Sequence, residues 1–147
     1  MEIHSDLSLV HPPPWNEPWA INIIWVLNDM REENGATRYL PYSHKISQPS
    51  GLPKAISHEM CPIEAEAGSI IAMDGRLWHT SGVNITQNEE RGLLFGYYTR
   101  SFIRPQWNFS AGLSDQTKSS LPDRLKYRLG LGLASNTYAD YSNHTEK

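Results

Sequence analysis

The sequence has a single cysteine, no long apolar run and little net charge. Cys61 alone cannot form an intrachain disulfide, so nothing indicates an oxidising compartment. No stretch is apolar enough for long enough to span a bilayer, and residues 1–14 lack the basic start and apolar centre of a signal peptide. We therefore expect a cytoplasmic protein without a membrane partner. The net charge of −3 argues against nucleic acid as a partner.

The 147 residues are enough for one domain, and 39% hydrophobic residues with 20% charged residues are typical of a globular chain. Apolar runs bounded by glycine and proline turns predict short strands over 19–27, 36–41, 62–66, 68–74, 76–80 and 91–100. A capping serine at Ser120, leucines at every fourth position and Gly130 predict one helix over about 120–130. We predict an all-β double-sheet jelly roll with a C-terminal helix over 1–134, and a polar tail over 135–147.

Two short stretches carry the residues for metal chemistry. Alternation along a strand puts His4 and Asp6 on one face, and a hairpin between 76–80 and 91–100 would bring His79 and Arg91 together. Two imidazoles and one carboxylate on one side of a metal suit non-haem Fe(II) and oxygen chemistry, because they leave positions open. His4, Asp6 and His79 fit this set. A buried, hydrogen-bonded core histidine explains His79 equally well, and the pattern leaves both interpretations open.

Arg91 and Ser81 add a second element to the hypothesis. A buried arginine can hold a carboxylate bidentately, and Ser81, two residues after His79 on the same side of the strand, can donate a further hydrogen bond. The alternative for Arg91 is a solvated charge at the start of a strand, since it follows Glu89 and Glu90.

These motifs resemble those of the phytanoyl-CoA dioxygenase family of Fe(II)/2-oxoglutarate oxygenases. The resemblance covers roughly residues 3–130 and rests on the ordered set His4-Ser5-Asp6, Trp25–Asp29, Asn34-Gly35-Ala36, Leu40–Lys45, Gly68-Ser69, His79–Asn84, Arg91, Tyr97-Tyr98 and Arg104-Pro105-Gln106.

The resemblance implies a cupin-like double-stranded β-helix in which His4, Asp6 and His79 bind Fe(II). It further implies that Arg91, assisted by Ser81, binds the distal carboxylate of 2-oxoglutarate, and that Trp25 lines the co-substrate pocket. The implied reaction uses O2 to hydroxylate a small organic substrate and releases succinate and CO2. A carboxylate at Asp6 favours hydroxylation over halogenation, because a halide would need that ligand position.

Members of the family usually carry a long segment before the His-x-Asp motif, whereas three residues precede His4 here. We expect the chain to be the C-terminal, catalytic portion of a longer oxygenase, and an in-frame coding sequence upstream would support this. An open sheet edge would then be available to a strand-supplying partner or to self-association. Loops 11–18, 42–60 and 101–109 would select the substrate. The alternatives are a non-catalytic jelly-roll binding module, an inactive fragment of a longer oxygenase, or an isomerase-type cupin.

Overall fold

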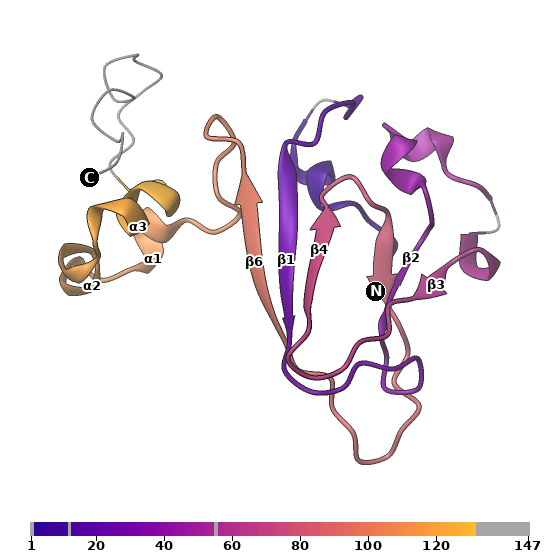
Figure 1. The fold of residues 1–147 in the computed structure, drawn as a ribbon. Helices are drawn as coiled ribbons and strands as arrows, with labels where there is room; N and C mark the ends of the chain where they lie inside the picture. Colours follow the sequence, from indigo (N-terminus) through magenta and orange to yellow (C-terminus); the bar gives the residue numbers. More distant parts are fainter. Residues whose placement is uncertain (1, 12, 55, 132–147) are drawn as a thin grey trace. The chain divides into compact units, whose positions relative to one another are not determined.

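The computed structural model describes residues 2–11, 13–54 and 56–131, and the chain divides into two compact units, residues 1–100 and 101–147. The predicted tail over 135–147 lies outside the described residues. In the described part no helix is long and apolar enough to cross a membrane. The first unit holds every strand (Figure 1), namely β1 (Ala20–Val26), β2 (Thr37–Tyr39), β3 (Cys61–Pro62), β4 (Ile70–Asp74), β5 (His79–Ser81) and β6 (Leu93–Thr99). Its short 3-10 helices are η1 (Asp6–Leu9), η2 (Ser43–Lys45), η3 (Pro49–Gly51) and η4 (Ile56–His58).

The strands form two antiparallel sheets of three strands each, with orders β4-β1-β6 and β3-β2-β5. Every connection between consecutive strands changes sheet except that from β2 to β3. This antiparallel two-sheet arrangement confirms the predicted all-β jelly-roll class. Five buried side chains form the main core cluster. They come from the N-terminal segment, from β1 and from the residues that adjoin β2 and β5: Leu7, Trp15, Ala20, Leu40 and Trp78.

The predicted hairpin between 76–80 and 91–100 is wrong. β5 pairs with β2, whereas β6 pairs along its whole length with β1 in the other sheet. The physical reason is that β6 is apolar and needs a long apolar partner, which β1 supplies over seven register pairs. His79 and Arg91 are therefore related across the two sheets and not along one hairpin.

The His4–Asp6 stretch also differs from the prediction of a continuous strand. His4 forms an isolated antiparallel bridge with His79, and Asp6 already begins helix η1. The strand ends at Ser5 because this residue is buried, and its hydroxyl donates to the Gly75 carbonyl oxygen at 2.9 Å. The backbone N–H of Leu7 donates to the same carbonyl at 2.8 Å. Both bonds turn the chain out of the strand.

Over its described residues, 101–131, the second unit contains three helices where one was predicted: α1 (Phe109–Gly112), α2 (Asp115–Ser120) and α3 (Asp123–Arg128). The predicted helix over 120–130 corresponds to α3. Helices α1 and α2 are single turns or little more, and side chains of Asn108 and Ser114 cap them. Helices this short show no apolar period, so periodicity could not reveal them.

Gly82 sets the distance between β5 and the segment that leads into β2. Its N–H donates to the Ala36 carbonyl oxygen at 3.0 Å, and a Cβ built on Gly82 would lie 2.4 Å from that oxygen. Only glycine permits this approach, because the atom in the way belongs to the backbone and cannot rotate aside. The hydrogen bond from Gly82 to Ala36 extends the pairing of β2 with β5 by one residue beyond Thr37 and Ser81.

Replacing Gly82 with alanine is therefore expected to destabilise the fold by about 1–3 kcal/mol, as overpacking of a tight contact does. Denaturant unfolding would measure the change in the free energy of unfolding. Gly112→Ala is the matched control, since a Cβ at Gly112 meets nothing within 4 Å. Equal stability of the two variants would contradict the steric argument.

Candidate metal centre

The two histidines are held side by side by backbone pairing. The N–H of His4 donates to the carbonyl of His79 at 3.0 Å, and the N–H of His79 donates back to His4 at 2.8 Å. Because the two residues face each other in this bridge, their side chains project to the same side, and the ring centroids lie 4.4 Å apart. The backbone bridge thus joins the start of the chain to β5 and places both imidazoles where one metal ion could bind them.

Asp6 completes the cluster from the first turn of η1. Its Oδ1 lies 4.0 Å from His4 Nε2 and 3.8 Å from His79 Nε2. The three residues each offer a ligand atom, and these atoms all lie within 4.8 Å of one another. Asp6 and His79 are largely buried, whereas the side chain of His4 is 37% exposed. The structure therefore brings together all three residues predicted as metal ligands, with one side open to solvent.

Hydrogen bonds at the far side of each ring fix which nitrogen faces the cluster. Nδ1–H of His79 donates to the Leu77 carbonyl oxygen at 2.9 Å, and Nδ1–H of His4 donates to the Glu2 carbonyl oxygen at 3.0 Å. A carbonyl can only accept, so each Nδ1 carries the proton and each neutral ring presents an Nε2 lone pair. This is the usual way in which proteins orient metal-binding imidazoles.

The environment of His79 favours the neutral ring that a metal requires. Burial lowers the pKa of His79 below the ordinary 6.5, and the positive charge of a protonated His4 would lower it further. The hydrogen bond to Leu77 and the charge of Asp6 act in the opposite direction but are outweighed. The ring of His79 is therefore unprotonated at neutral pH, as a metal ligand would have to be.

Two further side chains contact Asp6. The amide Nδ2 of Asn22, from the middle of β1, donates to Asp6 Oδ2 at 2.7 Å. The hydroxyl of Tyr97, on β6, donates to the backbone carbonyl of Asp6 at 3.3 Å. Sheet β4-β1-β6 thus supports the carboxylate, while sheet β3-β2-β5 carries His79.

Arg91 lies half-buried before β6 and reaches across to the other sheet. Its Nη1 donates to Thr37 Oγ1 at 2.8 Å, and Thr37 pairs with Ser81 in the register of β2 and β5. The next pair along these strands on the same face is Tyr39 with His79. Burial lowers the pKa of Arg91 below its ordinary value, yet a guanidinium stays charged at neutral pH. Arg91, Ser81 and His79 thus occupy one face.

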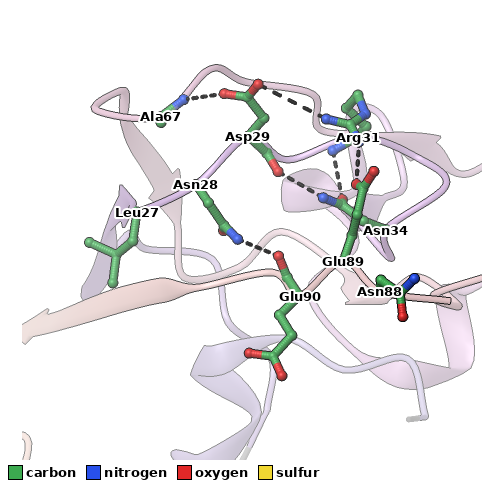
Figure 2. Close-up of a pocket in the computed structure, with 9 residues that line it drawn as sticks. All are labelled: Leu27, Asn28, Asp29, Arg31, Asn34, Ala67, Asn88, Glu89 and Glu90. Atoms are coloured by element: carbon green, nitrogen blue, oxygen red, sulfur yellow. Dashed lines mark hydrogen bonds and ion pairs between the residues drawn. The ribbon is translucent and has the colours of Figure 1, made fainter. Parts of the chain in front are cut away.

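The backbone around Arg91 is fixed by Asn28, as Figure 2 shows in part. The side-chain Nδ2 of Asn28 donates to the Glu90 carbonyl oxygen, and its Oδ1 accepts from the N–H of Gly92 at 2.6 Å. One amide therefore clamps the peptide groups on both sides of Arg91. Asn28 also lines a surface hollow of about 520 Å³, and none of the residues around that hollow belongs to the His–Asp–His cluster.

Trp25 is the predicted site residue that the structure does not bring to the cluster. Alternation along β1 puts Trp25 on the face opposite Asn22, and Asn22 is the residue that contacts Asp6. The ring of Trp25 lies beside Gly96 of β6, where an added Cβ would meet it at 3.0 Å. Other side chains of this outer face are large, apolar and exposed, among them Ile21, Ile70, Leu94 and Tyr98.

The sequence prediction missed Asn22, Asn28 and Thr37 as parts of the site. Asn22 left one signal, an amide in the middle of an otherwise apolar strand. Asn28 sits in a polar turn where its type is common, and Thr37 is an ordinary strand residue. Nothing in their local sequence distinguishes Asn28 and Thr37, because their partners are distant in the chain.

Two antiparallel sheets with a His-x-Asp motif and a distant histidine define a jelly roll of the cupin type, and the three side chains could hold a metal ion. The sequence model of the phytanoyl-CoA dioxygenase (PhyH) family matches residues 1–92. The match covers more than half of the chain and includes all three cluster residues together with Arg91. The chain belongs to the phytanoyl-CoA dioxygenase family, as its motifs predicted.

Individual relatives agree with this assignment. Dioxygenase af480 of Aspergillus fumigatus is 46% identical over 131 residues, which are 89% of this chain and 42% of the relative. The protein Rv1501 of Mycobacterium tuberculosis is 30% identical over 112 residues, or 76% of this chain and 40% of the relative. The chain thus spans about two fifths of the length of these relatives.

Solved structures show the same fold. EctD from S. alaskensis with bound Fe superposes with a TM-score of 0.57 at 24% identity, covering 71% of this chain and 40% of EctD. EvdMO1 superposes with a TM-score of 0.50 at 25% identity, covering 66% of this chain and 22% of that protein. Together they confirm the cupin-like architecture of the strands.

The lowered pKa of His79 predicts that the metal-free protein loses stability as the pH falls below the ordinary histidine value of about 6.5. In that window the unfolded chain takes up a proton at His79 while the folded chain does not, so protonation favours unfolding. Thermal unfolding in EDTA between about pH 5 and pH 8 measures the effect. His79→Asn should flatten this pH dependence, and the same change at exposed His11 should leave it intact. If His79→Asn kept the pH dependence of the wild type, His79 would not be the group that causes it.

Proposed function

We propose that this chain is an Fe(II)- and 2-oxoglutarate-dependent dioxygenase that hydroxylates a small organic substrate. One observation carries the proposal. Two imidazole Nε2 atoms and one carboxylate oxygen face each other, and the half-buried Arg91 donates to Thr37, two residues along β2 from the partner of His79. The candidate metal ligands and a guanidinium that can bind an anion thus lie on the same face of the β2–β5 pair.

The donor set fits Fe(II). Two imidazoles and one carboxylate bind this ion without filling its coordination sphere, and such sets with open positions are typical of non-haem iron oxygenases. The exposed side of His4 leaves a path from solvent to the three ligand atoms. EctD, which shares the fold, has been solved with bound Fe.

The separation between the cluster and Arg91 fits a dicarboxylate co-substrate. The pair Thr37–Ser81 follows Tyr39–His79 by two residues along each strand, a step of about 7 Å. A five-carbon 2-oxo acid with one end at the iron would therefore place its distal carboxylate beside Arg91. The guanidinium would bind this carboxylate with charge-assisted hydrogen bonds, and the hydroxyls of Thr37 and Ser81 would donate to it.

Iron and 2-oxoglutarate, when bound, would supply O2 activation for hydroxylation of a C–H bond, with release of succinate and CO2. The contribution of the protein is positioning. His4, His79 and Asp6 would hold the ion on one side. Arg91, fixed by its hydrogen bond to the buried Thr37, would orient the co-substrate. The carboxylate of Asp6 occupies the position that a halide would need, which favours hydroxylation over halogenation.

The proposed partner is a small-molecule substrate. The relative from Aspergillus fumigatus is named a dioxygenase, and EctD has also been solved with 2-oxoglutarate and 5-hydroxyectoine. These names support the reaction class. The substrate of this chain would be identified by succinate release across a panel of candidate metabolites.

Anaerobic addition of Fe(II) and 2-oxoglutarate should produce the visible charge-transfer band of the iron chelate. His79→Ala and Asp6→Ala should abolish the band, because each removes a ligand. Arg91→Ala should keep the band but raise the apparent Kd for 2-oxoglutarate about 10- to 100-fold, the loss expected for a charged hydrogen-bonding partner. Arg100→Ala is the matched control, since Arg100 is exposed at the other end of β6 and should have no effect.

Absence of the band from the folded wild-type chain would refute the oxygenase proposal and favour a non-catalytic jelly-roll module. If the wild type shows the band and Arg91→Ala shows it with the same apparent Kd for 2-oxoglutarate, only the role of Arg91 in binding the co-substrate is refuted.

A further inference from the structure

Asn22 is a polar residue in a place that local structure does not explain. It lies in the middle of β1 between Ile21 and Ile23, on the buried face of the strand, and is 7% exposed. Amides are poorly suited to such positions, because a strand favours β-branched and aromatic residues and burial removes the amide from water. A specific partner is needed to account for it.

The partner is one oxygen of Asp6. Asn22 Nδ2 donates to Oδ2 at 2.7 Å, while the other oxygen, Oδ1, is the atom that faces both imidazoles. An ionised carboxylate only accepts hydrogen bonds, so the amide must present its nitrogen to Asp6. The two carboxylate oxygens of Asp6 therefore have different partners: Oδ2 accepts from Asn22, and Oδ1 faces the imidazoles.

We infer that Asn22 is a positioning residue that keeps Asp6 a ligand through one oxygen only. This inference rests on the proposed iron site. With Oδ2 held by the amide, Asp6 would occupy a single coordination position, and the half of the coordination sphere opposite the three ligands would stay open for co-substrate and O2. A carboxylate free to bind through both oxygens would close one of those positions.

The Oδ1 atom of Asn22 distinguishes a positioning role from the ordinary hydrogen bonding of a structural asparagine. Asn22 Oδ1 is buried and has no hydrogen-bond partner among the described residues. Asn34, another buried asparagine, uses both amide atoms: its Oδ1 accepts from the N–H of Arg31 and its Nδ2 donates to the Asp29 carbonyl. A structural asparagine is satisfied at both ends, as Asn34 is. Asn22 is satisfied only where it touches Asp6.

The test compares Asn22→Leu and Asn22→Gln with the wild-type chain, using Co(II) as the probe in place of Fe(II). The visible absorption of Co(II) gives the metal Kd, water-proton relaxation of the Mn(II) complex reports exchangeable water on the ion, and thermal unfolding in EDTA reports the fold. Asn22→Leu removes the donor in a shape that suits the strand. Asn22→Gln keeps an amide donor on a longer stem. Asn34→Leu is the matched control.

Asn22→Leu should raise the Co(II) Kd about 10- to 100-fold, the usual cost of losing a partner of a metal ligand. Its Mn(II) complex should carry one exchangeable water fewer, since Oδ2 becomes a ligand, and its unfolding temperature in EDTA should not fall. Asn22→Gln should stay closer to the wild type. Asn34→Leu should lower the unfolding temperature and leave the Kd unchanged. Where Asn22→Leu does not fold, Asn22→Ala takes its place.

The inference is overturned if the wild type binds metal and Asn22→Leu binds it with the same Kd and the same hydration. It is also overturned if Asn22→Leu and Asn22→Gln lose equal affinity, because packing and not the donor would then be the cause. A wild-type chain that binds neither Co(II) nor Fe(II) overturns the proposed function and this inference with it.

Discussion

The pair of backbone hydrogen bonds between His4 and His79 is the contact on which the centre depends. It joins the first residues of the chain to β5, and it does so through main-chain atoms whose spacing the sheet itself imposes. Ser5 and Leu7 then anchor to Gly75, which turns the chain and directs Asp6 back toward both rings. Without the bridge, His79 would remain on its strand, but His4 would have no fixed position beside it.

Charge in the centre is balanced between its two ends. Asp6 contributes a carboxylate and Arg91 a guanidinium, while burial lowers the pKa of His79 and keeps its imidazole neutral. A divalent cation and a doubly charged dicarboxylate would add charges that cancel each other, so the complete assembly would be neutral in a largely buried space. Asn22 and Asn28 orient the two charged residues with amides, which bring direction without further charge.

The sequence was sufficient for the family and the fold class, because these depend on residue type and order. It also singled out His4, Asp6 and His79, which the structure brings together. The sequence did not predict how the fold brings these residues together. Period-two alternation suggested a strand through Asp6, but tertiary bonds from Ser5 and Leu7 to Gly75 end that strand earlier. Proximity in sequence suggested a hairpin between His79 and Arg91, whereas the demand of β6 for an apolar partner separates them into two sheets. Partners such as Thr37 are set by that long-range pairing and leave no local trace.

The clamp at Asn28 has a consequence for how this protein can vary. It contacts the carbonyl of Glu90, which every residue possesses, and the N–H of Gly92, which every residue except proline possesses. A change of side chain at Glu90 would therefore alter the charge and shape of the neighbouring surface without removing either hydrogen bond of the clamp. Arg91 would keep its place between the two clamped peptide groups.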